Sequence, residues 1–136
     1  MLVNGRKLAE QAKESIREIS CHELAVLMDN DIILIDVREH HEIESGILPG
    51  AVHMSRGVLE MQLENHPSVA HHPEPLQVMS QQPVYLYCRS GARSALAAES
   101  LRRMGFAHVY SLAGGILAWQ EAGLPVISLS QRHAGQ

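Results

Sequence analysis

Residues 84 to 105 constrain the fold more than any other stretch, because a buried-strand pattern turns there into a helix pattern. Val84 to Tyr87 is a short apolar run of β-branched and aromatic residues, typical of a parallel strand buried on both faces. Small and apolar residues then recur at helical spacing as far as Gly105, a natural helix end. Cys88 is therefore predicted to lie between the carboxyl end of a strand and the amino end of a helix.

The segment after Cys88 is predicted to stabilise an anion. Ligands of open α/β sheets collect beyond the carboxyl ends of the strands, where a helix amino end offers unpaired N–H groups and partial positive charge. That field favours a thiolate, and Gly91 lets the loop turn its N–H groups inward. The alternative is an inert core cysteine. The residues expected around the sulfur are Arg89, Ser90, Gly91, Ala92, Arg93 and Ser94.

Three further residues are expected to support this site. The apolar run at 32 to 35 predicts a second buried strand, and Asp36 and Arg38 emerge at its carboxyl end. A charged pair at that depth must satisfy itself, so we expect an Asp36–Arg38 network that fixes the loop. Trp119 follows a Gly-Gly turn into the last helix and is expected to pack in the core.

The remaining local signals concern the chain around this core. Residues 6 to 16 have the apolar spacing of an amphipathic helix, and Ser20 with Glu23 has the spacing of a capping box. Cys21 would then lie in a first helical turn, which is expected to acidify it modestly. Short strands are also predicted at 51 to 54 and 109 to 112.

Two features of the sequence each allow two interpretations. His53 is interpreted either as a proton shuttle or anion contact, or as a hydrogen-bonded strand residue. Residues 65 to 83, rich in proline and histidine, form a long connection with one helical turn near 76 to 79. Such a connection either rims a site or is plain surface.

Composition limits the classes of protein that the chain can belong to. A length of 136 residues with 46% hydrophobic content suits one domain with a real core. The net charge of −4, without a basic block, argues against nucleic-acid binding, and no long apolar run indicates a membrane segment or signal peptide. We therefore expect a cytoplasmic protein with two free thiols. The nine histidines lack metal-ligand spacing, so no metal is expected.

Four motifs in order resemble the rhodanese family over about residues 18 to 126. They are Asp36-Val37-Arg38, then Glu42 with Gly46-Ile47-Leu48-Pro49-Gly50-Ala51, the Cys88 loop, and Gly114-Gly115 with Ala118-Trp119. The resemblance implies an α/β domain, a small parallel sheet of about five strands with helices on both faces. This agrees with the alternation of strands and helices. The domain would follow a helical extension at 1 to 17 and precede a flexible tail at 127 to 136.

The activity implied by the resemblance is sulfur transfer through a Cys88 persulfide, without a cofactor. The donor would be a small molecule such as thiosulfate, and the acceptor a thiol or cyanide. The family's mercaptopyruvate enzymes tend to carry Cys-Gly-Ser-Gly, from which Arg89 departs, so thiosulfate is favoured. One alternative is a regulatory or sulfur-relay module that passes the persulfide to a protein partner. Another is a phosphatase or arsenate reductase; the cell-cycle phosphatases share the fold but use Cys-x5-Arg, whereas four residues separate Cys88 from Arg93.

Overall fold

The computed structural model describes residues 1–129, which form a parallel five-stranded sheet in the order β1-β5-β4-β2-β3. The strands are β1 Arg17–Ile19, β2 Ile33–Asp36, β3 Val52–His53, β4 Val84–Tyr87 and β5 Val109–Leu112. The α-helices are α1 Gly5–Ser15, α2 Cys21–Leu27, α3 His40–Ile43, α4 Leu59–Gln62, α5 Pro75–Ser80, α6 Ala92–Met104 and α7 Gly115–Glu121, with a 3-10 helix at Leu63–Asn65. The predicted α/β fold is confirmed.

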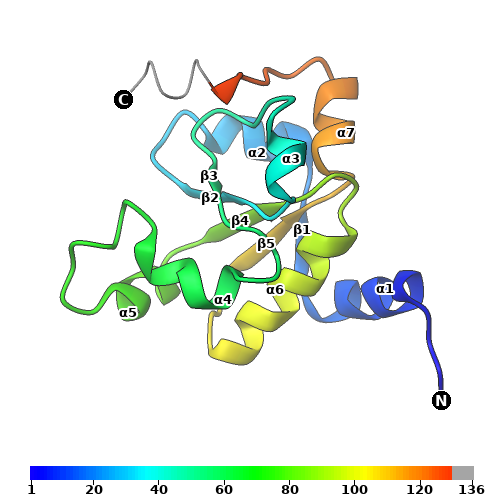
Figure 1. The fold of residues 1–136 in the computed structure, drawn as a ribbon, viewed down its shortest axis with the longest axis horizontal. Coiled ribbons are helices and arrows are strands. Elements are labelled where there is room, and N and C mark those ends of the chain that lie inside the picture. The colour runs from blue at the N-terminus through cyan, green and yellow to red at the C-terminus, as the bar shows by residue number, and fades with distance from the viewer. Residues whose placement is uncertain (130–136) are drawn as a thin grey trace.

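The sheet separates two helical layers (Figure 1). Helices α2, α3 and α7 lie on one side, and α1, α4, α5 and α6 on the other. Alternate residues of β4 enter different cores: Val84 and Leu86 belong to the cluster under α6, whereas Tyr85 and Tyr87 belong to the cluster with Trp119. Both faces of β4 are thus buried, which explains its continuous apolar sequence.

The first strand is the element that local patterns do not reveal. Only Ile19 of β1 is buried, so its three residues carry no strand signature. Hydrogen bonding along β5 nevertheless makes β1 an edge of the sheet. The predicted capping box of α2 is confirmed, because Glu23 N–H donates to Ser20 Oγ and Ser20 N–H donates to Glu23 Oε1, each at 3.2 Å.

Segments near both ends of the described chain contact the rest of the fold. Helix α1 begins after Asn4, whose Oδ1 accepts from the Lys7 N–H at 2.8 Å, and its buried Ala9 and Ala12 lie on the side that packs on α6. Near the other end, Ile127 exchanges two backbone hydrogen bonds with Ile47. Most of the predicted flexible tail, residues 130–136, lies outside the described residues. Within residues 1–129, no helix combines the length and apolar character needed to span a bilayer.

Asp36 and Arg38 form the predicted buried pair at the end of β2. Arg38 donates from Nη2 to Asp36 Oδ2 at 2.8 Å and from Nε to both carboxylate oxygens at 3.1 Å. The same guanidinium donates to the carbonyls of Gly46 at 2.7 Å and Glu42 at 3.3 Å. Asp36 is fully buried and Arg38 is 4% exposed, so the network ties β2 to the segment that contains α3.

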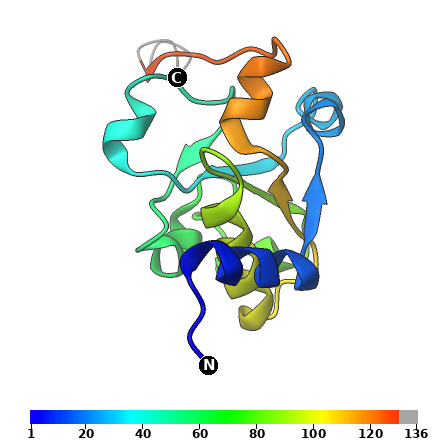
Figure 2. The ribbon, with the colours of Figure 1, turned by 90° about the vertical axis from the view of Figure 1, so that its right-hand side faces the viewer.

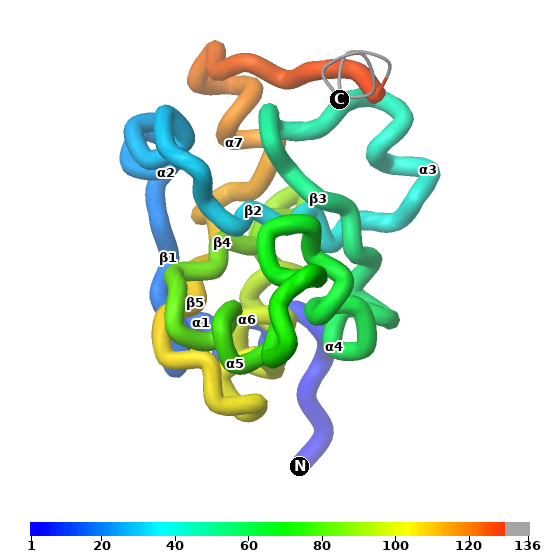
Figure 3. Tube along the Cα trace, turned by 90° about the vertical axis from the view of Figure 1, so that its left-hand side faces the viewer, coloured from blue at the N-terminus to red at the C-terminus, as the bar shows by residue number. Residues whose placement is uncertain are grey.

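The predicted connection at 65 to 83 contains α5, lies near α4 (Figure 3) and buries His66. The Ser68 N–H and hydroxyl approach His66 Nδ1 at 3.2 and 2.9 Å, which leaves the ring proton on Nε2. Nε2 has no hydrogen-bond partner among the described residues. Burial lowers the pKa of His66 from its ordinary value of 6.5, because the charged ring would be poorly solvated there.

This burial predicts that His66 destabilises the fold in mild acid. Below about pH 6.5 the unfolded chain binds a proton that the folded chain resists, so the free energy of unfolding should fall as pH drops from 7 to 5. In His66→Asn, whose amide oxygen can still accept the Ser68 N–H, this pH dependence should weaken by at most about 1.4 kcal/mol per pH unit. Urea unfolding at both pH values measures it. Exposed His71 supplies the control, His71→Asn; an unchanged slope in His66→Asn would contradict the prediction.

The Asp36–Arg38 network predicts a large cost for removing one partner. Asp36→Asn leaves the Arg38 guanidinium buried without its counterion and should lower the free energy of unfolding by about 3–5 kcal/mol. Arg56 supplies the comparison, because its pair with Glu60 is about one-third exposed. Arg56→Gln should cost less than about 1 kcal/mol. Denaturant titration of both variants checks the contrast, and similar losses would contradict it.

Candidate functional site

The predicted strand-to-helix junction lies at the centre of the sheet. Strand β4 is flanked by β2 and β5, so the segments after these three strands meet at one end of the sheet. Cys88 follows β4 directly, and α6 begins at Ala92. Gly91, the residue before α6, has φ +105°, a left-handed conformation that other residues rarely adopt. The tight turn therefore depends on glycine, as the sequence predicts.

The sulfur of Cys88 is surrounded by hydrogen-bond donors. The Gly91 N–H donates to Sγ at 3.1 Å and the Ser94 N–H at 3.4 Å. Ser94 Oγ lies 3.5 Å from Sγ and 2.7 Å from Ser111 Oγ. Cys88 is 1% exposed and both serines are fully buried. The sulfur therefore has two N–H donors and a hydroxyl within hydrogen-bonding distance, although its side chain also belongs to an apolar core cluster.

Ser111 is a site residue that sequence reasoning missed. It is a buried hydroxyl in the otherwise apolar strand β5. A serine at such a position needs a hydrogen-bond partner, and this requirement was the only available signal. The partner is Ser94, 17 residues earlier in the chain.

The carbonyl groups of the Cys88 loop are held away from the sulfur by α7. The Ile116 N–H donates to Cys88 O at 2.9 Å, and the Leu117 N–H donates to Arg89 O at 3.1 Å. This approach requires Gly115, which has φ +61° and whose added Cβ would lie 2.4 Å from Arg89 O. From sequence the Gly-Gly pair indicates a turn; in the structure it also anchors the loop.

Arg93 forms an ion pair with Glu42. Its Nη1 and Nη2 donate to the two carboxylate oxygens of Glu42 at 2.6 and 2.9 Å. These bonds lower the pKa of Glu42 to about 2, so the pair stays charged at neutral pH. Arg89, in contrast, is exposed and makes no ion pair within residues 1–129. Of the two loop arginines, Arg89 alone offers an uncompensated charge.

The other predicted residues lie around this centre. Trp119 is 1% exposed and its Nε1–H donates to Pro125 O at 2.8 Å, so it packs in the core as expected. His53 is a hydrogen-bonded strand residue, with Nε2 at 2.7 Å from Arg38 O. Cys21 lies in the other core cluster from Cys88. Burial raises the pKa of the Cys21 thiol, so the expected acidification is wrong.

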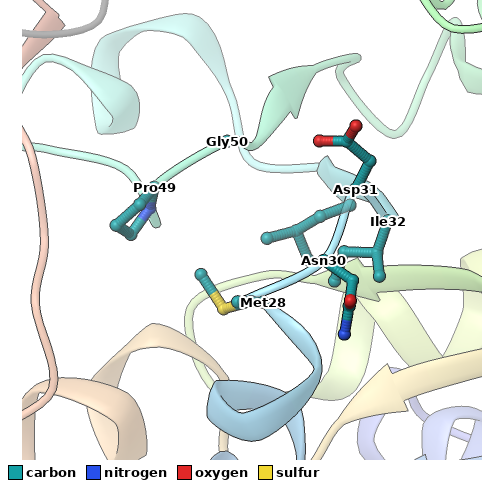
Figure 4. Close-up of a pocket in the computed structure, with 7 residues that line it drawn as sticks. Met28, Asn30, Asp31, Ile32, Pro49 and Gly50 are labelled. Atoms are coloured by element: carbon teal, nitrogen blue, oxygen red, sulfur yellow. The ribbon is translucent and has the colours of Figure 1, made fainter.

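Two surface depressions adjoin the Cys88 loop. One of about 170 Å³ lies between α3 and α7, with Arg38, Glu42 and Arg89 in its wall. The second lies beside α1 and includes Ser90 and Ala92. A third depression, of about 250 Å³, is lined by Met28, Asn30, Pro49 and their neighbours (Figure 4). It includes Ile32, just before the amino end of β2, and is therefore remote from Cys88. In the part of the chain that the structure describes, no group of three or more His, Cys, Asp or Glu could hold a metal ion.

Comparison with known proteins agrees with this geometry. A family model for the rhodanese-like domain matches residues 20–122. A sulfurtransferase from Allochromatium vinosum is 33% identical over 98 residues, which cover 72% of this chain and 80% of that protein.

Two solved structures extend the likeness over most of the chain. The polysulfide-sulfur transferase homodimer of Wolinella succinogenes is 33% identical with a TM-score of 0.70, covering 94% of this chain and 90% of that one. A Rhodopseudomonas palustris protein of unknown function, described as a possible tyrosine phosphatase, is 29% identical with a TM-score of 0.77, covering 93% and 96%. The family match spans three-quarters of the sequence and includes the loop around Cys88, and so the chain belongs to the rhodanese-like domain family.

Proposed function

We propose that the protein is a sulfurtransferase in which Cys88 carries the transferred sulfur as a persulfide. Its relatives support sulfur transfer in general. The observation that carries the assignment to Cys88 is the pair of backbone N–H groups, from Gly91 and Ser94, directed at its sulfur. Such donors stabilise negative charge on Sγ before the reaction and on the persulfide after it.

The proposed donor is thiosulfate. The Cys88 thiolate attacks the sulfane sulfur, the S–S bond of the donor breaks, and sulfite leaves with the bonding electron pair. Because sulfite departs as a stable anion, no general acid is needed. The acceptor, a thiol or cyanide, then removes the outer sulfur and regenerates the Cys88 thiolate. The cycle needs no metal or cofactor.

The two loop arginines have different roles in this proposal. Arg89 is exposed beside the depression between α3 and α7, where it can attract an anionic donor. Arg93 holds Glu42 of α3 and thereby positions the first turn of α6, which supplies the Ser94 N–H. The name of the Wolinella relative makes polysulfide a second candidate donor, and it is an anion of the same kind.

Phosphate-ester hydrolysis is the competing activity, given the description of the Rhodopseudomonas neighbour. This activity is disfavoured because the loop from Cys88 to Arg93 is one residue shorter than the Cys-x5-Arg loop of the cell-cycle phosphatases. Glu42 also engages the arginine that would have to bind the phosphate oxygens. Transfer to a protein thiol uses the same Cys88 chemistry and differs only in the acceptor.

The proposal predicts that the two cysteines are unequal. Cys88→Ser should abolish sulfur transfer from thiosulfate to cyanide, because serine forms no persulfide. Cys21→Ser should leave the rate nearly intact, because Cys21 lies in the other core cluster and the Gly91 and Ser94 N–H groups donate to Cys88. Thiocyanate formation measures both variants. Comparable losses in the two would contradict the single-cysteine mechanism, provided that both unfold at the parent's temperature.

A further inference from the structure

The depression beside α1, called the cavity below, has a volume of about 310 Å³ and lies between helix α1 and the Cys88 loop. Helix α1 crosses α6 in the foreground of Figure 2; it contacts α6, and its Ala9 and Ala12 are buried. The lining residues come from both elements: Gly5, Arg6, Ala9, Glu10 and Lys13 from α1, and Ser90 and Ala92 from the loop. The helix outside the family match therefore forms one wall of a space beside the proposed site.

This cavity carries unpaired charge. Arg6, Glu10 and Lys13 make no ion pair or side-chain hydrogen bond within residues 1–129. Two cations and one carboxylate leave a net positive charge in the wall. The charges thus remain available to a ligand, unlike that of Arg93, which Glu42 neutralises.

The volume leaves room for a ligand larger than thiosulfate. About 310 Å³ is at the lower end of the range for small-molecule sites, roughly 300–1,000 Å³. In thiosulfate the charged oxygens are two bonds from the sulfane sulfur, so its charge must stay close to Cys88 and Arg89. Helix α1 suits a molecule whose negative charge lies several atoms from its reacting sulfur.

We propose that the cavity between α1 and the Cys88 loop binds the sulfur acceptor, a small thiol carrying carboxylate groups, through Arg6 and Lys13. This inference rests on the proposed persulfide chemistry. The acceptor thiolate attacks the outer sulfur of the Cys88 persulfide, which lies about 2.05 Å beyond Sγ. A new S–S bond forms, the bond to Sγ breaks, and its electron pair remains on Sγ as thiolate. The proton on the transferred sulfur moves with it, so no other oxidant or reductant is required.

The second half-reaction tests the site apart from sulfur loading. Protein loaded with thiosulfate and freed of excess donor is mixed with mercaptosuccinate, a dicarboxylate thiol, or with neutral 2-mercaptoethanol. Arg6→Gln and Lys13→Gln should each slow discharge by mercaptosuccinate about twofold to fivefold and leave 2-mercaptoethanol unaffected. Glu10→Gln should change the mercaptosuccinate rate in the opposite direction, and added salt should reduce all these differences.

Lys7 provides the matched control, because it is exposed on α1 but does not line the cavity. Lys7→Gln removes the same charge and should leave both thiols unaffected. The proposal is overturned if Arg6→Gln and Lys13→Gln match Lys7→Gln, or if they slow both thiols equally. Failure of the parent protein to take up sulfur would instead overturn the persulfide chemistry itself, and with it this role of α1.

Discussion

The site depends on the contact between α7 and the Cys88 loop. The carbonyls of Cys88 and Arg89 accept hydrogen bonds from the Ile116 and Leu117 N–H groups, and these bonds hold the two carbonyls on the α7 side of the loop. These bonds fix the first two peptide groups of the loop on α7, and the Gly91 and Ser94 N–H groups that follow donate to the sulfur. Gly115 makes this approach possible, since any Cβ there would overlap the loop backbone. A glycine 27 residues after the cysteine thus allows α7 to anchor the loop that follows the cysteine.

Two ion pairs extend this arrangement across the end of the sheet. Arg38 joins Asp36 at the end of β2 to carbonyls of the α3 segment, and Glu42 of α3 then binds Arg93 of α6. The sequence of contacts runs from the core to the surface, from a fully buried carboxylate to a partly exposed guanidinium. The buried member is expected to govern stability, whereas the outer pair positions the first turn of α6.

Much of this architecture could be predicted because its signals are local. Each of three signals predicts the backbone conformation at its own position, and the structure confirms them. They are the apolar run from Val84 to Tyr87, the glycine at 91 and the Ser20 capping box. Residues whose role depends on distant partners could not be found in this way. Glu42 meets Arg93 across 51 positions, and nothing local to either marks the pair. Ser111 and β1 were missed for the same reason, since each acquires its role only from its neighbour in the folded sheet.

The central claim is that the short loop around Cys88 accepts a sulfur atom and does not hydrolyse phosphate esters. One paired measurement tests it directly: purified protein is given thiosulfate or an aryl phosphate, and intact mass and phosphate release are recorded. The account predicts a gain of one sulfur in the intact mass, removed by a thiol, and no steady release of phosphate. Sustained aryl phosphate turnover by a protein that gains no sulfur would contradict it.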